Sequence, residues 1–136
     1  MSADLYAFLN PQKPTEEKEI IISERFKDQD GNIIPFKIRA ITQEENDMLA
    51  KKSRKGKKVN GIYNEQLDNT EYSRRLVVAA TVFPPFDNAE ICKKYDVLDP
   101  LLVPGKMLLA GEYAKLVNAI MEISDFGGLE DEVKNY

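Results

Sequence analysis

Hydrophobic and polar residues alternate between positions 19 and 41, a spacing typical of half-buried β-strands. The apolar positions are Ile20, Ile22 and Phe26, followed by Ile34, Phe36, Ile38 and Ala40. Residues 28–32 between them contain Asp30-Gly31, which suits a tight turn because glycine tolerates a positive φ. The pattern predicts a β-hairpin that rests on helices. Pro35 lacks a backbone donor, so the return strand should lie at a sheet edge or carry a bulge.

Beyond residue 41 the apolar residues recur three and four positions apart, which favours helices. Thr42 and Glu45 form a capping-box pattern that predicts a helix start, and residues 87–90 repeat the pattern. A longer helix is expected over about residues 65–83, before Pro84-Pro85. Pro100 and Pro104 are expected at first helical positions.

The last predicted helix, about residues 105–124, carries two apolar stripes. One stripe comprises Leu109, Tyr113, Leu116, Ile120 and Ile123, and the second comprises Met107, Ala110, Ala114, Val117 and Met121. Two interpretations remain open. Either the helix is central and its own domain covers both stripes, or the methionine-bearing stripe binds a partner or a second copy of this chain.

The pattern as a whole predicts one α+β domain over residues 1–136, with an N-terminal β-hairpin packed on a mainly helical C-terminal part. Leu5, Phe8 and Leu9 predict a short helical segment inside a flexible N-terminal arm of about residues 1–18. Residues 51–64 are expected to form a mobile basic loop, because Gly56 and Asn60-Gly61 interrupt regular structure. Residues 125–136 are expected to be a frayed acidic tail.

Three features of the sequence indicate where in the cell the protein acts. The longest uninterrupted apolar run, residues 76–80, is far shorter than the roughly 18 residues of a membrane-spanning helix. Met1 to Asn10 has neither the basic start nor the apolar core of a secretory signal. Cys92 is the only cysteine, which excludes an internal disulfide. These features predict a cytoplasmic protein that does not associate with membranes.

Most catalytic and metal-binding chemistry has no support in this sequence. The chain has no histidine and one cysteine, so it lacks the usual nucleophile–base pairs and the ligands of zinc and iron–sulfur sites. It also has neither a GxxxxGK[ST] nor a GxGxxG phosphate-binding motif. We therefore expect no catalytic residue, metal or cofactor, and a role in binding other protein chains.

One charged segment could bind a partner. Its basic residues are Lys51, Lys52, Arg54, Lys55, Lys57 and Lys58. They could contact phosphates or an acidic protein segment, although a solvated loop is the commoner meaning of such a run. No aromatic residue interrupts the run, and the net charge is −4, so nucleic-acid binding is not favoured.

Several short motifs follow one another in a characteristic order. They are Phe8-Leu9-Asn10, Ser23-Glu24-Arg25-Phe26-Lys27-Asp28, Asp30-Gly31, Pro35-Phe36-Lys37-Ile38-Arg39, Ile41-Thr42, Glu45-Asn46, Leu76-Val77-Val78, Pro84-Pro85, Asp87, Met107-Leu108-Leu109-Ala110-Gly111-Glu112-Tyr113 and Leu116. In order and spacing, this set resembles the XkdN-like phage tail assembly chaperones, which are encoded in phages and prophage-like elements of Gram-positive bacteria.

The resemblance implies a protein that coats the tape measure protein and is displaced when subunits of the tail tube polymerise. It also implies that a longer, frameshifted form can exist. Two alternatives stay open: a structural component retained in the tail, and a small phage regulator that binds nucleic acid through Lys51–Lys58.

Overall fold

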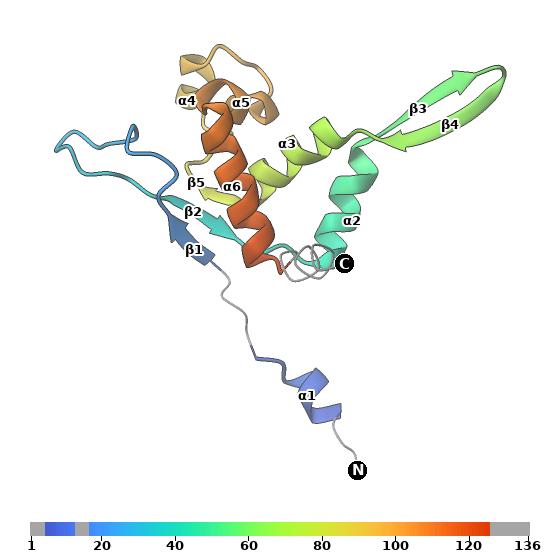
Figure 1. The fold of residues 1–136 in the computed structure, drawn as a ribbon, viewed down its shortest axis with the longest axis horizontal. Coiled ribbons are helices and arrows are strands. Elements are labelled where there is room, and N and C mark those ends of the chain that lie inside the picture. The colour runs from blue at the N-terminus through green and yellow to red at the C-terminus, as the bar shows by residue number, and fades with distance from the viewer. Residues whose placement is uncertain (1–4, 13–16, 126–136) are drawn as a thin grey trace.

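The computed structural model describes residues 5–12 and 17–125, in which helices pack on a small antiparallel sheet (Figure 1). The α+β class predicted from the sequence is confirmed. The short helix α1 (Leu5–Leu9) is also confirmed, and it stands apart from the body. Residues 1–4, 13–16 and 126–136, which include part of the predicted flexible arm and nearly all of the predicted acidic tail, lie outside the described residues.

The predicted hairpin is present as strands β1 (Glu17–Ile20) and β2 (Phe36–Arg39). A third strand, β5 (Thr81–Phe83), pairs with the other edge of β2, so β2 is the central strand and does not lie at an edge. The register of the β2–β5 pair shifts between Lys37 and Ile38, which is not the position of Pro35, where the sequence allowed for a bulge. Pro35 causes no conflict because it lies immediately before β2.

The two strands are shorter than predicted because residues 21–35 form a long connection. The Asp28 carboxylate accepts hydrogen bonds from the backbone amides of Asp30 and Asn32, both at 2.9 Å, and Gly31 adopts a φ of 85°. Only one bridge, between Lys27 and Ile33, continues the pairing toward this turn. The side chain of Asp28 therefore organises the connection where a regular ladder was expected.

Four helix starts lie close to their predicted positions. Helix α2 (Gln43–Lys52) begins with the Thr42–Glu45 capping box, and α4 (Ala89–Lys94) is capped by Asn88. The short helix η1 (Pro100–Leu102) and helix α5 (Val103–Met107) each carry proline in their first two positions. Local side-chain chemistry sets these starts, which is why the sequence alone could locate them.

The predicted basic loop over residues 51–64 is instead a β-hairpin. Strands β3 (Arg54–Val59) and β4 (Ile62–Leu67) pair in register along their whole length. Asn60 and Gly61, with φ of 54° and 80°, form the two-residue turn between them. The prediction of a loop was wrong because Asn-Gly, read as a break in regular structure, is also the preferred connection of a tight hairpin.

Two helix boundaries also differ from the prediction. Helix α3 (Asn69–Ala80) begins later than expected because β4 and the Asp68 cap precede it, and it ends where β5 joins the sheet. Helix α6 (Ala110–Ile123) replaces the single helix expected over residues 105–124. Leu108 and Leu109 are extended between α5 and α6 and separate the two helices.

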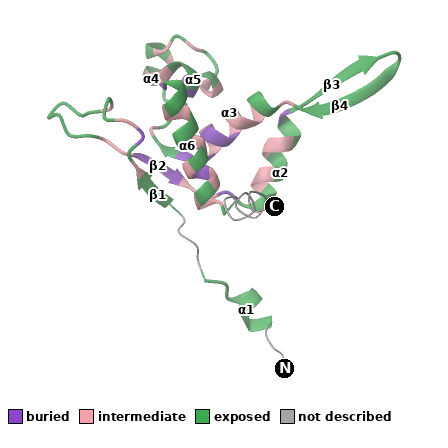
Figure 2. Ribbon diagram, in the orientation of Figure 1, coloured by how far each residue is buried: buried purple, intermediate pink, exposed green. Residues whose placement is uncertain are grey.

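The core lies between the sheet and helices α3, α5 and α6 (Figure 2). Its fully buried side chains include Ile38, Val77, Val103, Leu116 and Ile120. Burial of these apolar surfaces is the main stabilising term of the fold. By contrast, Phe8 and the other apolar side chains of α1 are 70–83% exposed. Within residues 5–12 and 17–125, no helix is both long and apolar enough to cross a bilayer.

Candidate partner-binding groove

The structure divides the methionine-bearing stripe predicted for the last helix. Met107 lies in α5, before the extended Leu108 and Leu109, and is not part of α6. It lines a separate apolar recess of about 140 Å³ together with Phe26 and Phe36. Because a continuous helix was assumed across residues 105–124, Met107 was wrongly placed beside the other four residues.

The remaining four residues follow one side of α6. Ala110 and Ala114 are exposed, whereas Val117 and Met121 are half-buried and pack against the core. The other stripe faces the sheet and α3 at Leu116 and Ile120, which are fully buried, whereas its first member, Leu109, is 62% exposed. One side of α6 is thus covered by the rest of the domain. The small side chains of Ala110 and Ala114 lie at the border of this side and remain accessible to solvent.

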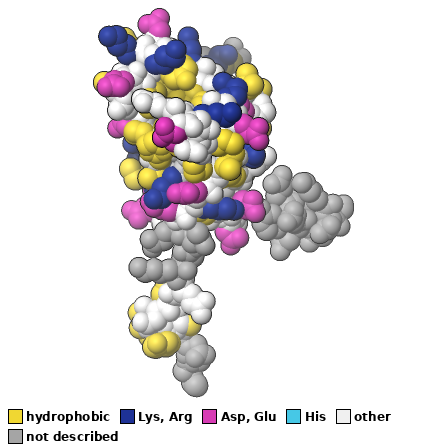
Figure 3. Space-filling view, turned by 90° about the vertical axis from the view of Figure 1, so that its left-hand side faces the viewer, with side chains coloured by type: hydrophobic (Ala, Val, Ile, Leu, Met, Phe, Trp, Pro, Cys, Tyr) yellow, Lys and Arg dark blue, Asp and Glu magenta, His cyan; other side chains and the backbone are white. Residues whose placement is uncertain are grey.

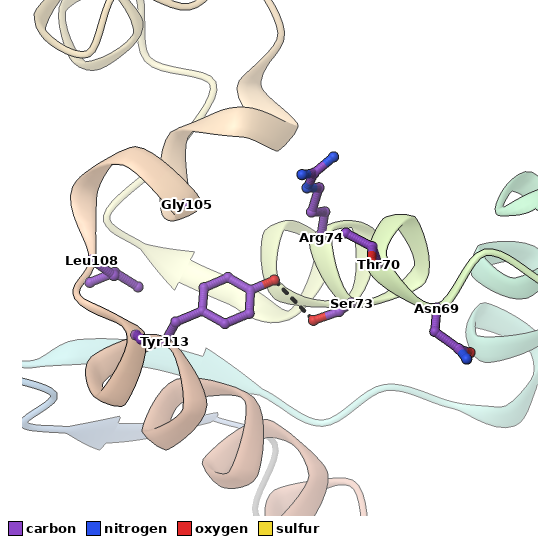
Figure 4. Close-up of a pocket in the computed structure, with 8 residues that line it drawn as sticks. Asn69, Thr70, Ser73, Arg74, Gly105, Leu108 and Tyr113 are labelled. Atoms are coloured by element: carbon purple, nitrogen blue, oxygen red, sulfur yellow. Dashed lines mark hydrogen bonds between the residues drawn. The ribbon is translucent and has the colours of Figure 1, made fainter.

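Ala110 opens into a cavity of about 600 Å³ between the first half of α3 and the junction of α5 and α6 (Figure 4). The lining residues are Asn69, Thr70, Ser73, Arg74, Gly105, Leu108, Ala110 and Tyr113. We call this cavity, with the exposed Ala114 next to it, the α3–α6 groove. Cavities between packed helices are common binding sites for ligands and partner segments.

The floor of the groove is fixed by a contact between its two walls. Tyr113 extends from α6 toward α3, and its hydroxyl lies 2.9 Å from Ser73 Oγ, at hydrogen-bonding distance (Figure 4). Leu108 is buried at the base, whereas the Arg74 side chain is exposed at the α3 wall. The groove therefore combines an apolar base with polar walls and one exposed cation.

The start of α6 is anchored by an ion pair to the connection between β1 and β2. Arg25 Nε donates to Glu112 Oε2 at 3.0 Å, and Arg25 Nη2 lies 2.5 Å from Glu112 Oε1. Glu112 also accepts from the backbone amide of Leu109 at 2.8 Å. The hydrogen bonds from Arg25, and then those from Ser23 and Leu109, hold the pKa of Glu112 at about 2.

Sequence reasoning did not find the α3 side of the groove. Asn69, Thr70, Ser73 and Arg74 lie on the polar flank of α3, which a hydrophobic pattern marks only as facing solvent. Their approach to α6 depends on how the two helices cross, and no local signal encodes that packing. Only Ala110 among the five predicted stripe residues lines the cavity.

The predicted basic residues are divided between two elements. Lys51 and Lys52 end α2, and the other four lie on β3. All six side chains are exposed. Lys55 Nζ lies 2.9 Å from Asp68 Oδ2, so one of the six cations is paired within the chain.

Among the described residues, no group of three His, Cys, Asp or Glu side chains is arranged to hold a metal ion. Cys92 is half-buried, and its thiol donates to the carbonyl of Phe86 at 3.3 Å. This contact is typical of a structural cysteine at the edge of a core.

Comparison with known proteins shows similarity along nearly the whole chain. The family model described as "Phage XkdN-like tail assembly chaperone protein" matches residues 5–135. YqbN of Bacillus subtilis strain 168 is 37% identical, over 97% of this chain and 93% of the relative. The phage-like element PBSX protein XkdN of the same strain is 36% identical, over 95% and 93%. A crystal structure of YqbN aligns with a TM-score of 0.74 at 34% identity, over 92% of this chain and 98% of that chain.

Proposed function

Because this chain belongs to the family of XkdN-like phage tail assembly chaperones, we propose that it binds the tape measure protein before the tail tube forms. Subunits of the tube then displace it as they polymerise along the tape measure protein. The protein acts in the cytoplasm of the bacterial host and works by contact, without catalysis. The absence of histidine from the sequence supports a role without acid–base or nucleophilic chemistry.

The α3–α6 groove is the surface that best suits such a client. An amphipathic helix can lay its apolar side chains into a groove of this kind, because the burial of those side chains drives the association. Ala110 and Ala114 are small and exposed, so a second helix can approach α6 closely there. Leu109 is 62% exposed beside them and supplies further apolar area.

The polar α3 wall of the groove favours a client that carries negative charge. Arg74 is exposed at the α3 side of the groove, where it can pair with a carboxylate of the client. A client helix with one apolar face flanked by acidic residues therefore fits best. Such a contact is small compared with a permanent interface, which suits a chaperone that tube subunits must later displace. The partly accessible apolar border of α6 is the single observation that carries this proposal.

A pair of neighbouring substitutions tests the groove. Ala110→Glu places a carboxylate in the cavity, whereas Gly111→Glu adds the same charge one residue later, where a side chain meets open space. Both lie in the first turn of α6, where the helix dipole tolerates an acidic residue. We expect Ala110→Glu to weaken co-purification with the tape measure protein by about tenfold or more, because the longer side chain occupies the cavity and its carboxylate competes with the client for Arg74.

Gly111→Glu should co-purify like the unmodified chain, and both variants should give unchanged circular dichroism spectra. Equal co-purification of all three proteins would reject the groove as the client site. Displacement is tested separately by mass spectrometry of purified tails, from which this chain should be absent. Its presence in stoichiometric amount would instead indicate a structural component of the tail.

A further inference from the structure

The hairpin β3–β4 and the end of α2, residues 51–67, form a basic arm that projects from the body (Figure 1). Every residue of both strands is exposed, and each strand pairs only with the other. An isolated two-stranded hairpin is marginally stable in water and usually rests on another element. The basic arm is therefore an element that contact with a partner would stabilise.

The side chains of the basic arm indicate the chemistry of that partner. Cations occupy both faces of the hairpin, since neighbouring residues of β3 point to opposite sides. The tip is apolar: Val59 is 46% exposed, Ile62 64% and Tyr63 65%. A matching surface needs carboxylates around an apolar recess, because the tip gains from burial and the cations gain from opposite charge.

The charge balance of the chain favours a second copy as the partner. The basic arm carries six basic and one acidic side chain, which leaves thirteen basic and twenty-two acidic side chains, a net charge of −9, on the rest of the chain. Such a body attracts the arm of another copy and repels the phosphates of a nucleic acid. Figure 3 shows the face on the opposite side of the body from the arm, where acidic and hydrophobic side chains lie among several basic ones.

A recess of about 500 Å³ beside α4 has the matching composition. Its lining residues are Asp87, Ala89, Cys92, Lys93, Asp96, Val97, Leu98 and Pro100. Leu98 is fully exposed, at 102%, and both aspartates are exposed at the surface. Lys93 is the one basic side chain of this lining.

We propose that the basic arm of one copy docks into the recess beside α4 of a second copy. Each copy then offers one arm and one recess, on different parts of its surface, so the contact is head-to-tail and can add further copies in a row. This association belongs to the chain itself and needs no tape measure protein, so it is tested independently of the proposed function.

Sedimentation velocity of the purified chain at low and high salt tests the association. At low salt the unmodified protein should form species larger than one copy that dissociate at high salt, because the contact is largely electrostatic. Lys57→Glu with Lys58→Glu should weaken association by about tenfold or more, since two attractions become repulsions. The control Lys18→Glu with Lys27→Glu makes the same change of charge at exposed sites outside the arm and should still associate.

A mixing experiment identifies the recess. Asp87→Lys with Asp96→Asn reverses the charge there, and asparagine suits the φ of 55° at residue 96. This recess variant keeps an intact arm, and the arm variant, Lys57→Glu with Lys58→Glu, keeps an intact recess. Each should be monomeric alone, and the two should form a one-to-one complex when they are mixed. A monomeric unmodified protein, or a mixture that stays monomeric, overturns the proposal. Salt-sensitive binding of random duplex DNA by a monomeric chain, lost in the arm variant, would also overturn it and assign the arm to nucleic acid.

Discussion

At the scale of single residues, the pair Arg25–Glu112 joins the start of α6, on one side of the groove, to the connection between β1 and β2. The Glu112 side chain is 12% exposed and accepts hydrogen bonds from both Arg25 and the amide of Leu109. Arg25 also donates to the carbonyl of Met107 at 3.2 Å, so one guanidinium joins the ends of α5 and α6. The position of Ala110, which lies between these contacts in sequence, follows from them.

We expect Glu112→Gln to lower the free energy of unfolding near neutral pH, because the ion pair and its hydrogen bonds stabilise the charged carboxylate. A carboxyl group whose pKa is lowered on folding stabilises the fold above its unfolded pKa, and that contribution is lost as the pH falls toward the folded value. For Glu112 this window runs from about 4.5 down to about 2. Urea unfolding of both proteins at a series of pH values measures the difference between their free energies of unfolding.

The difference between the original protein and Glu112→Gln should shrink as the pH falls through that window. Glu122→Gln, at an exposed position of the same helix, should differ little from the original protein throughout. A difference that stays constant from neutral pH down to about 2 would show that the carboxylate charge of Glu112 is not what stabilises the junction.

Some of these residues could be predicted from the sequence and others could not. The Thr42–Glu45 capping box depends on neighbours three residues apart, so its spacing was visible in the chain. Arg25 and Glu112 are 87 positions apart, and Ser73 and Tyr113 are 40 apart. Contacts at such separations depend on the packed arrangement of whole elements, which a single sequence does not display.

At the scale of elements, the hairpin β3–β4 is the clearest departure from expectation. Its turn requires positive φ at both Asn60 and Gly61, with values of 54° and 80°. Tyr63 covers Gly56 on the neighbouring strand, where a Cβ atom would lie 1.8 Å from the tyrosine hydroxyl. Gly61, which was read as an interruption, is instead required by the turn, and Gly56 leaves room for the Tyr63 ring.

We expect Gly61→Val to disrupt the hairpin, since a β-branched residue in the left-handed region costs about 1–2 kcal/mol. The amide protons of β3 and β4 should then exchange faster with solvent, as measured by NMR. The free energy of unfolding of the body should change by less than about 0.5 kcal/mol, because surface changes outside the core have small effects.

Asn60→Gly is the matched control, because glycine accepts the same positive φ, and its exchange rates in β3 and β4 should stay close to those of the unmodified chain. If amide protons of the core exchange as fast as those of the hairpin in Gly61→Val, the arm is not independent of the body.

The helices could be predicted where local sequence signals mark their ends. Asn88 and Pro100 mark the starts of α4 and η1, and both starts lie close to their predicted positions. The break between α5 and α6 was missed because Leu109 fits the apolar stripe of a continuous helix, whereas it is extended in the structure. Apolar periodicity predicts burial, yet Leu109 is 62% exposed.

At the scale of the whole molecule, the two proposals assign separate tasks to two surfaces. The α3–α6 groove is an accessible border of the core that suits an amphipathic helix, and the basic arm is a charged extension outside the core. Copies joined in a row by their arms would present their grooves repeatedly, which suits a long client. This arrangement follows from the combination of the two proposals, and either proposal can fail without the other.

Hydrogen–deuterium exchange of this chain, with and without the tape measure protein, tests the groove most directly. The account predicts slower exchange on binding in the first half of α3 and across residues 105–117, with little change in β1 and β2. Protection confined to the sheet, or no protection in α3 and α6 while the complex is formed, would contradict the claim that the client lies in the α3–α6 groove.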